Sequence, residues 1–293
     1  MKIVIPDDYQ DAVRHLRCFA KLDGHDVTIY NDTANDVDSL AERFREAEAL
    51  VLIRERTRIT RELLERLPKL KLISQTGKGT AHIDIEACKE RGIRVAVGTG
   101  SPYAPAELTW ALILAAMRRI PQEAASLRSG GWQTGLGTTV RNRTLGIFGH
   151  GKIGSLVAGF GRAFGMKVMI GGRDPETQEA MFRESDIVSL HLRLTDATRG
   201  IVTARHLAMM KPDSLLVNTA RAELIEPGAL VAGLKAGRPG FAALDVFEDE
   251  PVTDDPLLRL ENVLATPHLG YVERDSYELY FGQAFDALDE GNA

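Results

Sequence analysis

Short runs of apolar, β-branched residues alternate with helical patterns along most of the chain. Helical patterns cover residues 8–22, 60–67 and 83–92 in the first third. The runs are continuous rather than alternating, as is typical of parallel strands that are buried on both faces. This order predicts a parallel α/β sheet, and its strands are KIVI (2–5), DVTIY (26–30), ALVLI (49–53), KLIS (71–74) and IRVAV (93–97).

The pattern changes at GTGSPYAP (98–105), a loop rich in glycine and proline, which is followed by a long apolar helix pattern at 106–120. The stretch from 267 onward has the pattern of a single helix, which cannot bury its apolar face alone. We therefore expect two doubly wound domains, residues 1–98 with 267–293 and residues 99–266, joined by a hinge. The strands of the second domain are TLGIF (144–148), KVMIG (167–171), DIVSLH (186–191), SLLVN (214–218), FAALDVF (241–247) and NVLAT (262–266).

Composition narrows the possible functions. The 293 residues carry a formal net charge of −5, so no excess of basic residues points to nucleic acid. The two cysteines, Cys18 and Cys88, have neither a disulfide-framework nor a metal-ligand spacing, so no metal is expected. The N-terminal segment lacks the features of a signal peptide. The longest apolar run, WALILAAM (110–117), is far shorter than the roughly 20 residues of a membrane helix. We expect a cytoplasmic protein that binds neither membranes nor nucleic acid.

A glycine-rich loop, GHGKIG, follows the first strand of the second series and opens a helix pattern. In such a setting Gly149 allows the tight turn, Gly151 lets the backbone approach a pyrophosphate, and Gly154 lets the helix pack closely on the strand. The first N–H groups of the helix, at Lys152 and Ile153, would face the anion. The loop therefore predicts a dinucleotide site in preference to a plain βα turn.

The next strand ends in IGGRDP (170–175), where a dinucleotide site usually has an acid that binds the ribose. Gly172 takes that place, so no carboxylate repels a 2′-phosphate, and Arg173 is placed to pair with one. Asp174 remains able to bind a ribose hydroxyl, and the alternative for Arg173 is a solvated surface side chain. The expected cofactor is NAD or NADP, with NADP favoured.

Three polar motifs follow strand ends of the second series, where ligands bind in such sheets. With the glycine loop they resemble, in order and over nearly the whole chain, the D-isomer-specific 2-hydroxyacid dehydrogenases. That family includes D-3-phosphoglycerate and D-lactate dehydrogenases and hydroxypyruvate or glyoxylate reductases. The resemblance implies a Rossmann-type cofactor domain and a flavodoxin-like substrate domain. The three motifs are VNTARAELIE (217–226), ALDVFEDEP (243–251) and TPHLG (266–270).

The resemblance also implies roles for individual residues. Arg221 would bind the substrate carboxylate and polarise the keto oxygen. His268 would be the acid/base, and Glu250 its carboxylate partner, which favours the protonated ring and fixes it. Asp245 would bind the nicotinamide carboxamide. Taken singly, each has a structural alternative, such as a strand-end cap or an ion pair. Three further residues of these motifs are assigned to the cofactor, namely Thr219, Ala220 and Gly270.

The family places substrate-binding loops after strands of the first domain, here RERTRIT (54–60) and QTGKGTAHID (75–84). Gly77, Lys78 and Gly79 would offer backbone N–H groups to a substrate carboxylate. The side chain of Lys78 or Arg54 would add positive charge, although exposed basic loop residues are an equal alternative.

The chain departs from the family pattern in four places. Ala222 replaces a glycine and would be strained if that position needs a positive φ. Glu226 replaces an aspartate, and Tyr271 stands where a small residue is common. The stretch 174–184 is about half the usual length. Outside the motifs, we expect His191 to be a structural residue and His150 to face solvent or cofactor.

Together these features predict an oxidoreductase that transfers a hydride between NAD(P)H and a small 2-keto or D-2-hydroxy acid. The helix pattern at 106–120 is apolar on more than one face, which favours a two-fold homodimer. Two alternatives stay open. One is a related enzyme that oxidises another small anion, such as formate or phosphite. The other is a cofactor-sensing scaffold resembling the corepressor branch of the family.

Overall fold

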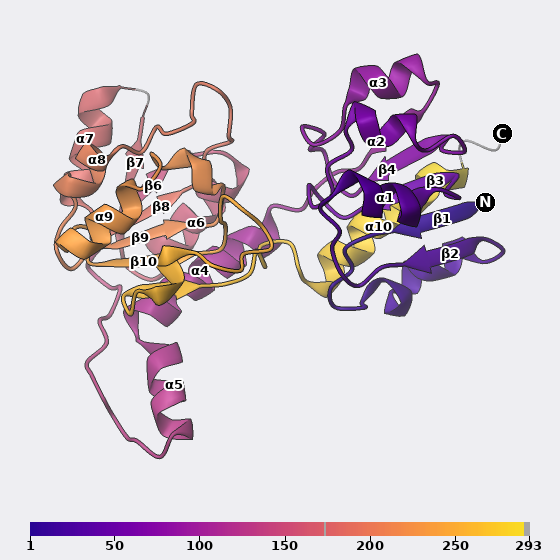
Figure 1. Cartoon of the computed structure of the whole chain (residues 1–293). Helices are drawn as coiled ribbons and strands as arrows, with labels where there is room; N and C mark the ends of the chain where they lie inside the picture. Colours follow the sequence, from indigo (N-terminus) through magenta and orange to yellow (C-terminus); the bar gives the residue numbers. More distant parts are fainter. Residues whose placement is uncertain (173, 290–293) are drawn as a thin grey trace. The chain divides into compact units, whose positions relative to one another are not determined.

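The chain divides into two compact units in a computed structural model, which describes residues 1–172 and 174–289 (Figure 1). The first unit contains Met1–Ser101 and Val272–Ala293, and the second contains Pro102–Tyr271. These divisions fall three and five residues after the expected boundaries at 98 and 266. Arg173, the residue on which the preference for NADP rests, lies outside the described residues.

The first unit is built on a parallel sheet of five strands. The strand order is β2-β1-β3-β4-β5, so the chain turns back after β2 and continues on the other side of β1. This order is that of flavodoxin-like doubly wound sheets. The strands are β1 (Lys2–Ile5), β2 (Asp26–Ile29), β3 (Ala49–Leu52), β4 (Leu72–Gln75) and β5 (Arg94–Val97).

Helices cover both faces of this sheet, which explains why the inner strands β1, β3 and β4 are buried over nearly their whole length. On one face, α1 (Val37–Phe44), α2 (Arg61–Glu65) and α3 (Ile85–Glu90) pack on alternate strand residues. On the other face lies the returning helix α10 (Arg274–Asp289), where Ser74 donates a hydrogen bond to the Ala284 carbonyl at 2.8 Å.

The helix expected over residues 8–22 is not a continuous helix. The structure has two 3₁₀ helices there, η1 (Val13–His15) and η2 (Arg17–Leu22). The buried Asp8 carboxylate accepts the N–H groups of Ala12 and Val13 and holds the chain in a turn. Leu16 is extended and separates the two helices. Local side-chain bonding therefore competes with the α-helix that the apolar spacing favours.

The second unit contains a parallel sheet of six strands in the order β11-β10-β9-β8-β6-β7. Strands β11 and β7 lie at the two edges of this sheet, and α7 (Pro175–Glu184) lies between β7 and β8 along the chain. The short stretch 174–184 is therefore one connecting helix and its cap. The strands are β6 (Thr144–Phe148), β7 (Lys167–Gly171), β8 (Ile187–Leu190), β9 (Leu215–Asn218), β10 (Phe241–Leu244) and β11 (Val263–Ala265).

This sheet is also covered on both faces, so the predicted pair of doubly wound parallel-sheet domains is confirmed. One core holds α4 (Tyr103–Met117) and α6 (Lys152–Ala163) against the strands. The opposite core holds α7, α8 (Ala204–Met209) and α9 (Ala229–Ala236). Short 3₁₀ helices, η3 (Ala222–Leu224) and η4 (Pro256–Arg259), follow β9 and precede β11.

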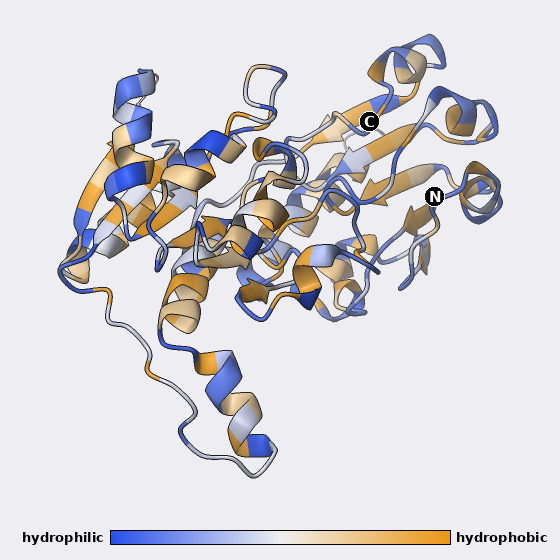
Figure 2. Cartoon of the chain, turned by 60° about the vertical axis from the view of Figure 1, so that its left-hand side comes forward, coloured by the Kyte–Doolittle hydropathy of each residue, from blue (hydrophilic) through white to orange (hydrophobic). Residues whose placement is uncertain are grey.

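The helix expected at 106–120 starts and ends earlier. Helix α4 begins at Tyr103, because Pro105 is tolerated in a first turn. Arg119 has a left-handed φ of 56° and directs the chain into a second helix, α5 (Ile120–Arg128). Helix α5 and the loop that follows extend away from the rest of the second unit (Figures 1 and 2). Within the described part of the chain, no helix is both long enough and apolar enough to cross a membrane.

The strand register brings the polar motifs of the second unit to one edge. Neighbouring strands pair in a row formed by Phe148, Leu190, Asn218, Leu244 and Ala265. Because the strands are parallel, the next residue of each strand leaves the sheet at the same carboxyl edge. Ligands bind at this edge in such sheets, and the residues placed there are Gly149, His191, Thr219, Asp245 and Thr266.

Candidate active site

The glycine loop has the backbone geometry that a phosphate-binding turn needs. Gly149 has a φ of +103°, and a Cβ there would lie 2.7 Å from the backbone of His191. A Cβ on Gly154 would lie 2.1 Å from the Gly149 carbonyl oxygen, so only glycine lets the helix approach the strand. Gly151 precedes α6, and a Cβ on it would point into open space. Gly149 and Gly154 permit close packing, while Gly151 leaves room for a ligand beside the first N–H groups of the helix.

Two histidines lie at this loop, His150 within it and His191 after the neighbouring strand β8. His150 is exposed, whereas the ring of His191 lies within 2.9 Å of the Ser189 hydroxyl. Burial lowers the pKa of His191 to about 4, so its ring is neutral near pH 7. A neutral, hydrogen-bonded ring beside Gly149 agrees with the expectation of a structural histidine. Lys152 and Ile153, both assigned to the cofactor, form the first turn of α6.

The segment after β9 is braced by Asn218. Its side chain accepts the N–H of Ala220 at 3.0 Å and donates to the Arg221 carbonyl at 2.8 Å. Thr219 shares a 2.7 Å hydrogen bond with Thr109 of α4. The Arg221 guanidinium donates to the Ala220 carbonyl at 2.7 Å. The turn therefore holds the arginine close to the carboxyl edge of the sheet.

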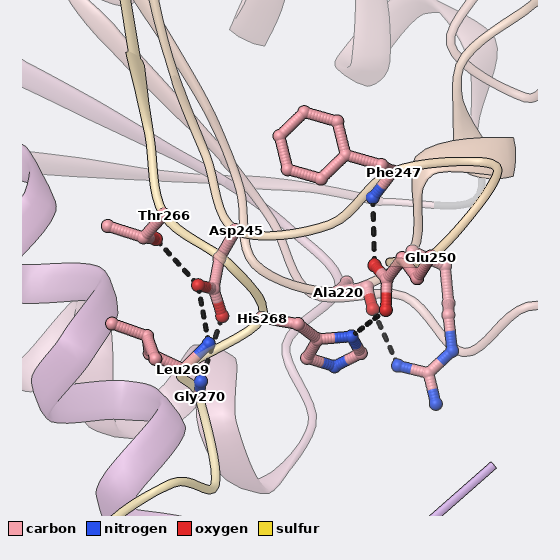
Figure 3. Close-up of polar contacts among 9 residues, drawn as sticks. Ala220, Asp245, Phe247, Glu250, Thr266, His268, Leu269 and Gly270 are labelled. Carbon is pink, nitrogen blue, oxygen red and sulfur yellow. Dashed lines mark hydrogen bonds and ion pairs between the residues drawn. The ribbon is translucent and has the colours of Figure 1, made fainter. Parts of the chain in front are cut away.

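Asp245 is fully buried and organises the turn that carries His268 (Figure 3). Its carboxylate accepts the N–H groups of Leu269 at 2.7 Å and Gly270 at 2.8 Å. It also accepts the Thr266 hydroxyl at 2.6 Å. Burial raises the pKa of Asp245, and the three hydrogen bonds offset part of that effect. We therefore identify Asp245 as the anchor of the turn at 266–270, a task that sequence alone did not suggest.

His268 and Glu250 form a close pair at this edge (Figure 3). The Nδ1 atom of His268 lies 2.5 Å from Oε2 of Glu250, and the Phe247 N–H donates to Oε1 at 2.9 Å. Burial tends to raise the pKa of Glu250, but the hydrogen bond and charge of His268 outweigh it, aided by Phe247 and Arg221. The net result is a pKa of Glu250 below its ordinary value, so the group is a carboxylate near neutral pH.

The backbone of His268 has a left-handed φ of 51°, which is unfavourable for a residue with a side chain. Such a conformation persists where the surroundings over-determine it. Here the two N–H groups that follow are held by Asp245, and the His268 N–H donates to the Thr266 carbonyl at 3.0 Å. Several hydrogen bonds therefore hold the backbone of the turn that carries this ring.

In the first unit, the two predicted substrate loops interlock. A Cβ on Gly77, which has a φ of +114°, would lie 2.2 Å from Nη1 of Arg54. A Cβ on Gly79 would lie 2.1 Å from a carboxylate oxygen of Glu55. The Arg54 N–H donates to Thr76 at 2.9 Å, which fixes one loop to the other. Gly77 is favoured by its positive φ, whereas a side chain at position 79 would need only the end of the Glu55 side chain to move. Glu55 also brings a negative charge to this loop. The fourth predicted residue of these loops, Lys78, is exposed.

At the ribose end of the expected cofactor site, the structure describes Gly172 and Asp174. A Cβ on Gly172 would have its nearest neighbour at 3.8 Å, so the position has space around it. The Asp174 carboxylate caps α7, because it accepts the N–H of Thr177 at 2.9 Å and its hydroxyl at 2.8 Å. Asp174 is thus engaged with its own helix.

Two departures from the family pattern have plain structural consequences. Ala222 opens η3 and is not among the described residues with positive φ, so the methyl group causes no backbone strain there. Glu226 accepts the N–H of Ala204 at 2.8 Å and caps α8, as expected for a conservative replacement.

Sequence reasoning gave no role to Asn218 or Thr109. Asn218 begins the N-x-x-R motif, so the three-residue spacing to Arg221 was a signal that the side chain serves the same turn. Thr109 lies on a helix 110 positions earlier and meets Thr219 only in the folded chain. In the parts that the structure describes, no cluster of three His, Cys, Asp or Glu side chains is arranged to hold a metal ion.

Comparison with known proteins agrees with this geometry. Residues 110–270 match the family described as D-isomer specific 2-hydroxyacid dehydrogenase, NAD binding domain. The chain is 39% identical over 265 residues to a glyoxylate reductase of Aeropyrum pernix, covering 82% of this chain and 78% of that protein. It is 38% identical over 289 residues to a D-3-phosphoglycerate dehydrogenase of Methanocaldococcus jannaschii, covering 92% of this chain. The chain spans about half, 53%, of the length of that relative.

The chain is also similar to solved structures of oxidoreductases that are named for hydroxy acids. A phosphoglycerate oxidoreductase from Vibrio cholerae superposes with a TM-score of 0.96 at 51% identity, over 100% of this chain and 99% of the other. A D-lactate dehydrogenase from Aquifex aeolicus, complexed with NAD and lactic acid, superposes with a TM-score of 0.78 at 28% identity. That match covers 99% of this chain and 95% of the other.

Proposed function

Because the chain belongs to the D-isomer-specific 2-hydroxyacid dehydrogenase family, we propose that His268 is the acid/base of its hydride-transfer reaction. The protein is an NAD(P)-dependent oxidoreductase that acts on CH–OH donors. Its proposed substrates are a small 2-keto acid and the matching D-2-hydroxy acid. The observation that carries the proposal is the 2.5 Å contact between His268 and Glu250 at the carboxyl edge of the sheet.

The pairing assigns the two ring nitrogens different tasks. Glu250 engages Nδ1, so Nε2 is the atom that faces the substrate. In reduction, Nε2 gives its proton to the carbonyl oxygen at C2, and in oxidation it takes the proton from the hydroxyl. The carboxylate of Glu250 compensates the positive charge of the protonated ring and fixes which nitrogen carries the mobile proton.

Arg221 is proposed to bind the substrate carboxylate. Its planar guanidinium can donate two parallel hydrogen bonds to a carboxylate and can also polarise the neighbouring keto oxygen. The brace from Asn218 and the hydrogen bond to the Ala220 carbonyl limit the positions that the side chain can take. The substrate would therefore be held with its C2 atom at a set place relative to His268.

The glycine loop fits a dinucleotide, since Gly151 leaves open space beside the N-terminus of α6. Bound NAD(H) would supply the hydride for C2 of the substrate. The residues proposed to hold it from the glycine loop and the neighbouring strand ends are Gly149, Gly151, Lys152, Ile153, Gly154, Thr219, Ala220, Asp245 and Gly270.

The test of this proposal is turnover with a panel of keto acids. NADH and NADPH oxidation would be followed with glyoxylate, hydroxypyruvate, pyruvate and longer 2-keto acids. We expect turnover with at least one of them. Tight cofactor binding without turnover on any of them would contradict the dehydrogenase assignment and favour a cofactor-sensing scaffold.

Glu250→Gln should lower kcat for reduction by about tenfold near neutral pH, because glutamine cannot compensate the positive charge of a proton-donating imidazole. Burial tends to raise the pKa of Glu250, but His268 outweighs that effect and lowers it, so the carboxylate persists below the usual range of a glutamate. In the unmodified enzyme, kcat should therefore fall only as the pH drops through that lowered pKa and Glu250 becomes protonated, and this acid limb should be absent in Glu250→Gln. Measurement of kcat against pH with a saturating keto acid checks this, and identical profiles for the two enzymes would show that the pair does not act in catalysis.

We propose that the protein prefers NADP, on the basis of Gly172 and Arg173. Arg173→Ala should raise the Kd of NADPH by about tenfold or more, the cost of one charge-assisted hydrogen bond, and change the Kd of NADH much less. Arg183→Ala, on the exposed surface of α7, is the matched control. Equal effects on the two cofactors would remove the basis for this preference.

The interlocked loops of the first unit are proposed to contribute to substrate binding through Arg54, Lys78 and the backbone N–H groups at 77–79. Gly77 supports this assignment, because any side chain there would displace the Arg54 guanidinium. From composition we also expect the protein to act in the cytoplasm.

We propose that two copies form a homodimer through the extension at α5. Four large apolar side chains there are well exposed to solvent, which is unusual unless a partner covers them. Light scattering should give about twice the 32.1 kDa chain mass, and a Leu127→Ser, Trp132→Ser variant should give the mass of one chain. A single-chain mass for the unmodified protein would contradict the proposal. The four side chains are Ile120, Leu127, Trp132 and Leu136.

A further inference from the structure

Tyr271 is in contact with the proposed acid/base. The ring centroids of Tyr271 and His268 are 5.4 Å apart, and the two planes meet at 75°, so the edge of one ring meets the face of the other. Tyr271 is buried, with 6% of its surface exposed, and it is the last residue of the second unit. The contact lies within the same short turn, three residues from His268.

Among the hydrogen bonds described for His268, one reaches its ring. Asp245 holds the backbone of the turn, and Glu250 engages a single ring atom, Nδ1. The torsion between Cβ and the ring of a histidine has a broad energy profile, so one hydrogen bond leaves the ring able to pivot. A displacement of Nε2 by about 1 Å is enough to slow a proton transfer markedly. A second contact, on the side of the ring, is what this arrangement still requires.

We propose that Tyr271 is a positioning residue, whose aromatic ring holds the imidazole plane of His268 so that Nε2 is aimed at the substrate. This inference rests on the proposed role of His268. It answers why a bulky aromatic residue follows the final glycine of the T-P-H-x-G motif. The alternative is that Tyr271 only fills buried space, in which case its loss would cost stability and leave the proton transfer alone.

An edge-to-face aromatic pair favours the aligned ring by a factor of roughly two to ten. Tyr271→Leu should therefore lower kcat by about that factor, while the KM of the keto acid and the Kd of NADH stay unchanged. Tyr271→Phe keeps the ring and should restore kcat to within about twofold of the original enzyme. Tyr277→Leu removes another buried tyrosine ring and should lower the melting temperature without lowering kcat.

Two results would overturn the proposal. If Tyr271→Leu keeps the full kcat, the ring does not position His268. If Tyr271→Phe loses as much as Tyr271→Leu, the hydroxyl rather than the ring is responsible. A rise in KM alone would assign Tyr271 to substrate binding and would also contradict the proposal.

An NMR measurement tests the contact between Tyr271 and His268 independently of the activity assay. In the unmodified protein, the ring protons of His268, assigned by comparison with His268→Ala, should show nuclear Overhauser contacts to the Tyr271 ring. Their chemical shifts should be retained in Tyr271→Phe and should move to those of a solvated imidazole in Tyr271→Leu. Absence of these contacts would refute the positioning role even in an active enzyme. Full turnover by His268→Ala would refute the proposed acid/base role of His268. The ring contact seen in the unmodified protein would then still stand, but it would not serve the reaction.

Discussion

Replacement of His268 by alanine is expected to lower kcat for keto-acid reduction by about 10²- to 10⁴-fold. The substrate carbonyl would lose its proposed proton donor, while the glycine loop proposed to bind the cofactor stays unchanged. The Kd of NADH, measured by fluorescence titration, should therefore remain within about twofold of the original value, because the loss is confined to the chemical step.

A matched control for this variant is His206→Ala. His206 accepts the Thr203 N–H at the start of α8 and stacks on Phe182, so its loss should cost stability without slowing turnover. The acid/base assignment would be contradicted if His268→Ala retained most of its kcat, or if the two variants were equally impaired.

Replacement of Arg221 by glutamine is expected to lower kcat/KM by roughly two to three orders of magnitude. A buried anion that loses its charged, hydrogen-bonded partner typically costs about 2–5 kcal/mol. Arg221→Lys keeps the charge but not the planar fork, and it should recover only part of the loss. Steady-state kinetics with the best keto acid would separate the two variants.

The Arg221 variants should also differ from the original enzyme in how the loss divides between KM and kcat. If Arg221 both binds the carboxylate and polarises the keto oxygen, KM should rise and kcat should fall. Arg259→Gln, at an exposed ion pair with Asp254, serves as the control and should leave both constants unchanged. An Arg221→Gln enzyme with an unaltered KM would show that another residue binds the carboxylate.

Most of the fold could be predicted from the strand runs. KIVI, TLGIF and KVMIG begin and end at the residues expected, and the other strands differ by a few residues at their ends. Continuous apolar runs identify strands that are covered on both faces. Because parallel strands share a carboxyl edge, these runs also predicted that the polar motifs would meet there.

The helices were harder to predict, for physical reasons that involve single residues. Residues 8–22 have a helical apolar spacing, but the Asp8 carboxylate competes for the backbone N–H groups of that stretch. The break between α4 and α5 depends on the left-handed backbone of Arg119. An arginine at that position gives no sign of such a conformation, whereas a glycine would have done so.

The motifs predicted candidate site residues, but not the contacts that hold these residues in place. The pairing of His268 with Glu250 was expected from the family resemblance. In the structure, Nδ1 of His268 and Oε2 of Glu250 are in contact. The hydrogen bonds from the turn at 266–270 to Asp245 form only because β10 pairs with β11. This pairing cannot be predicted from the local sequence of either strand. The preference for glycine at position 77 likewise comes from a backbone φ of +114° that the folded loop imposes.

The most direct test of the proposed reaction is the fate of a deuterium label. NADH carrying deuterium on either face of C4 would be incubated with the best keto acid, and the product would be analysed by mass and by chiral separation. The proposed reaction predicts that one of the two labelled forms delivers its deuterium to C2 of a D-2-hydroxy acid. A product of L configuration, or one that carries no label from either form, would contradict direct hydride transfer at this site.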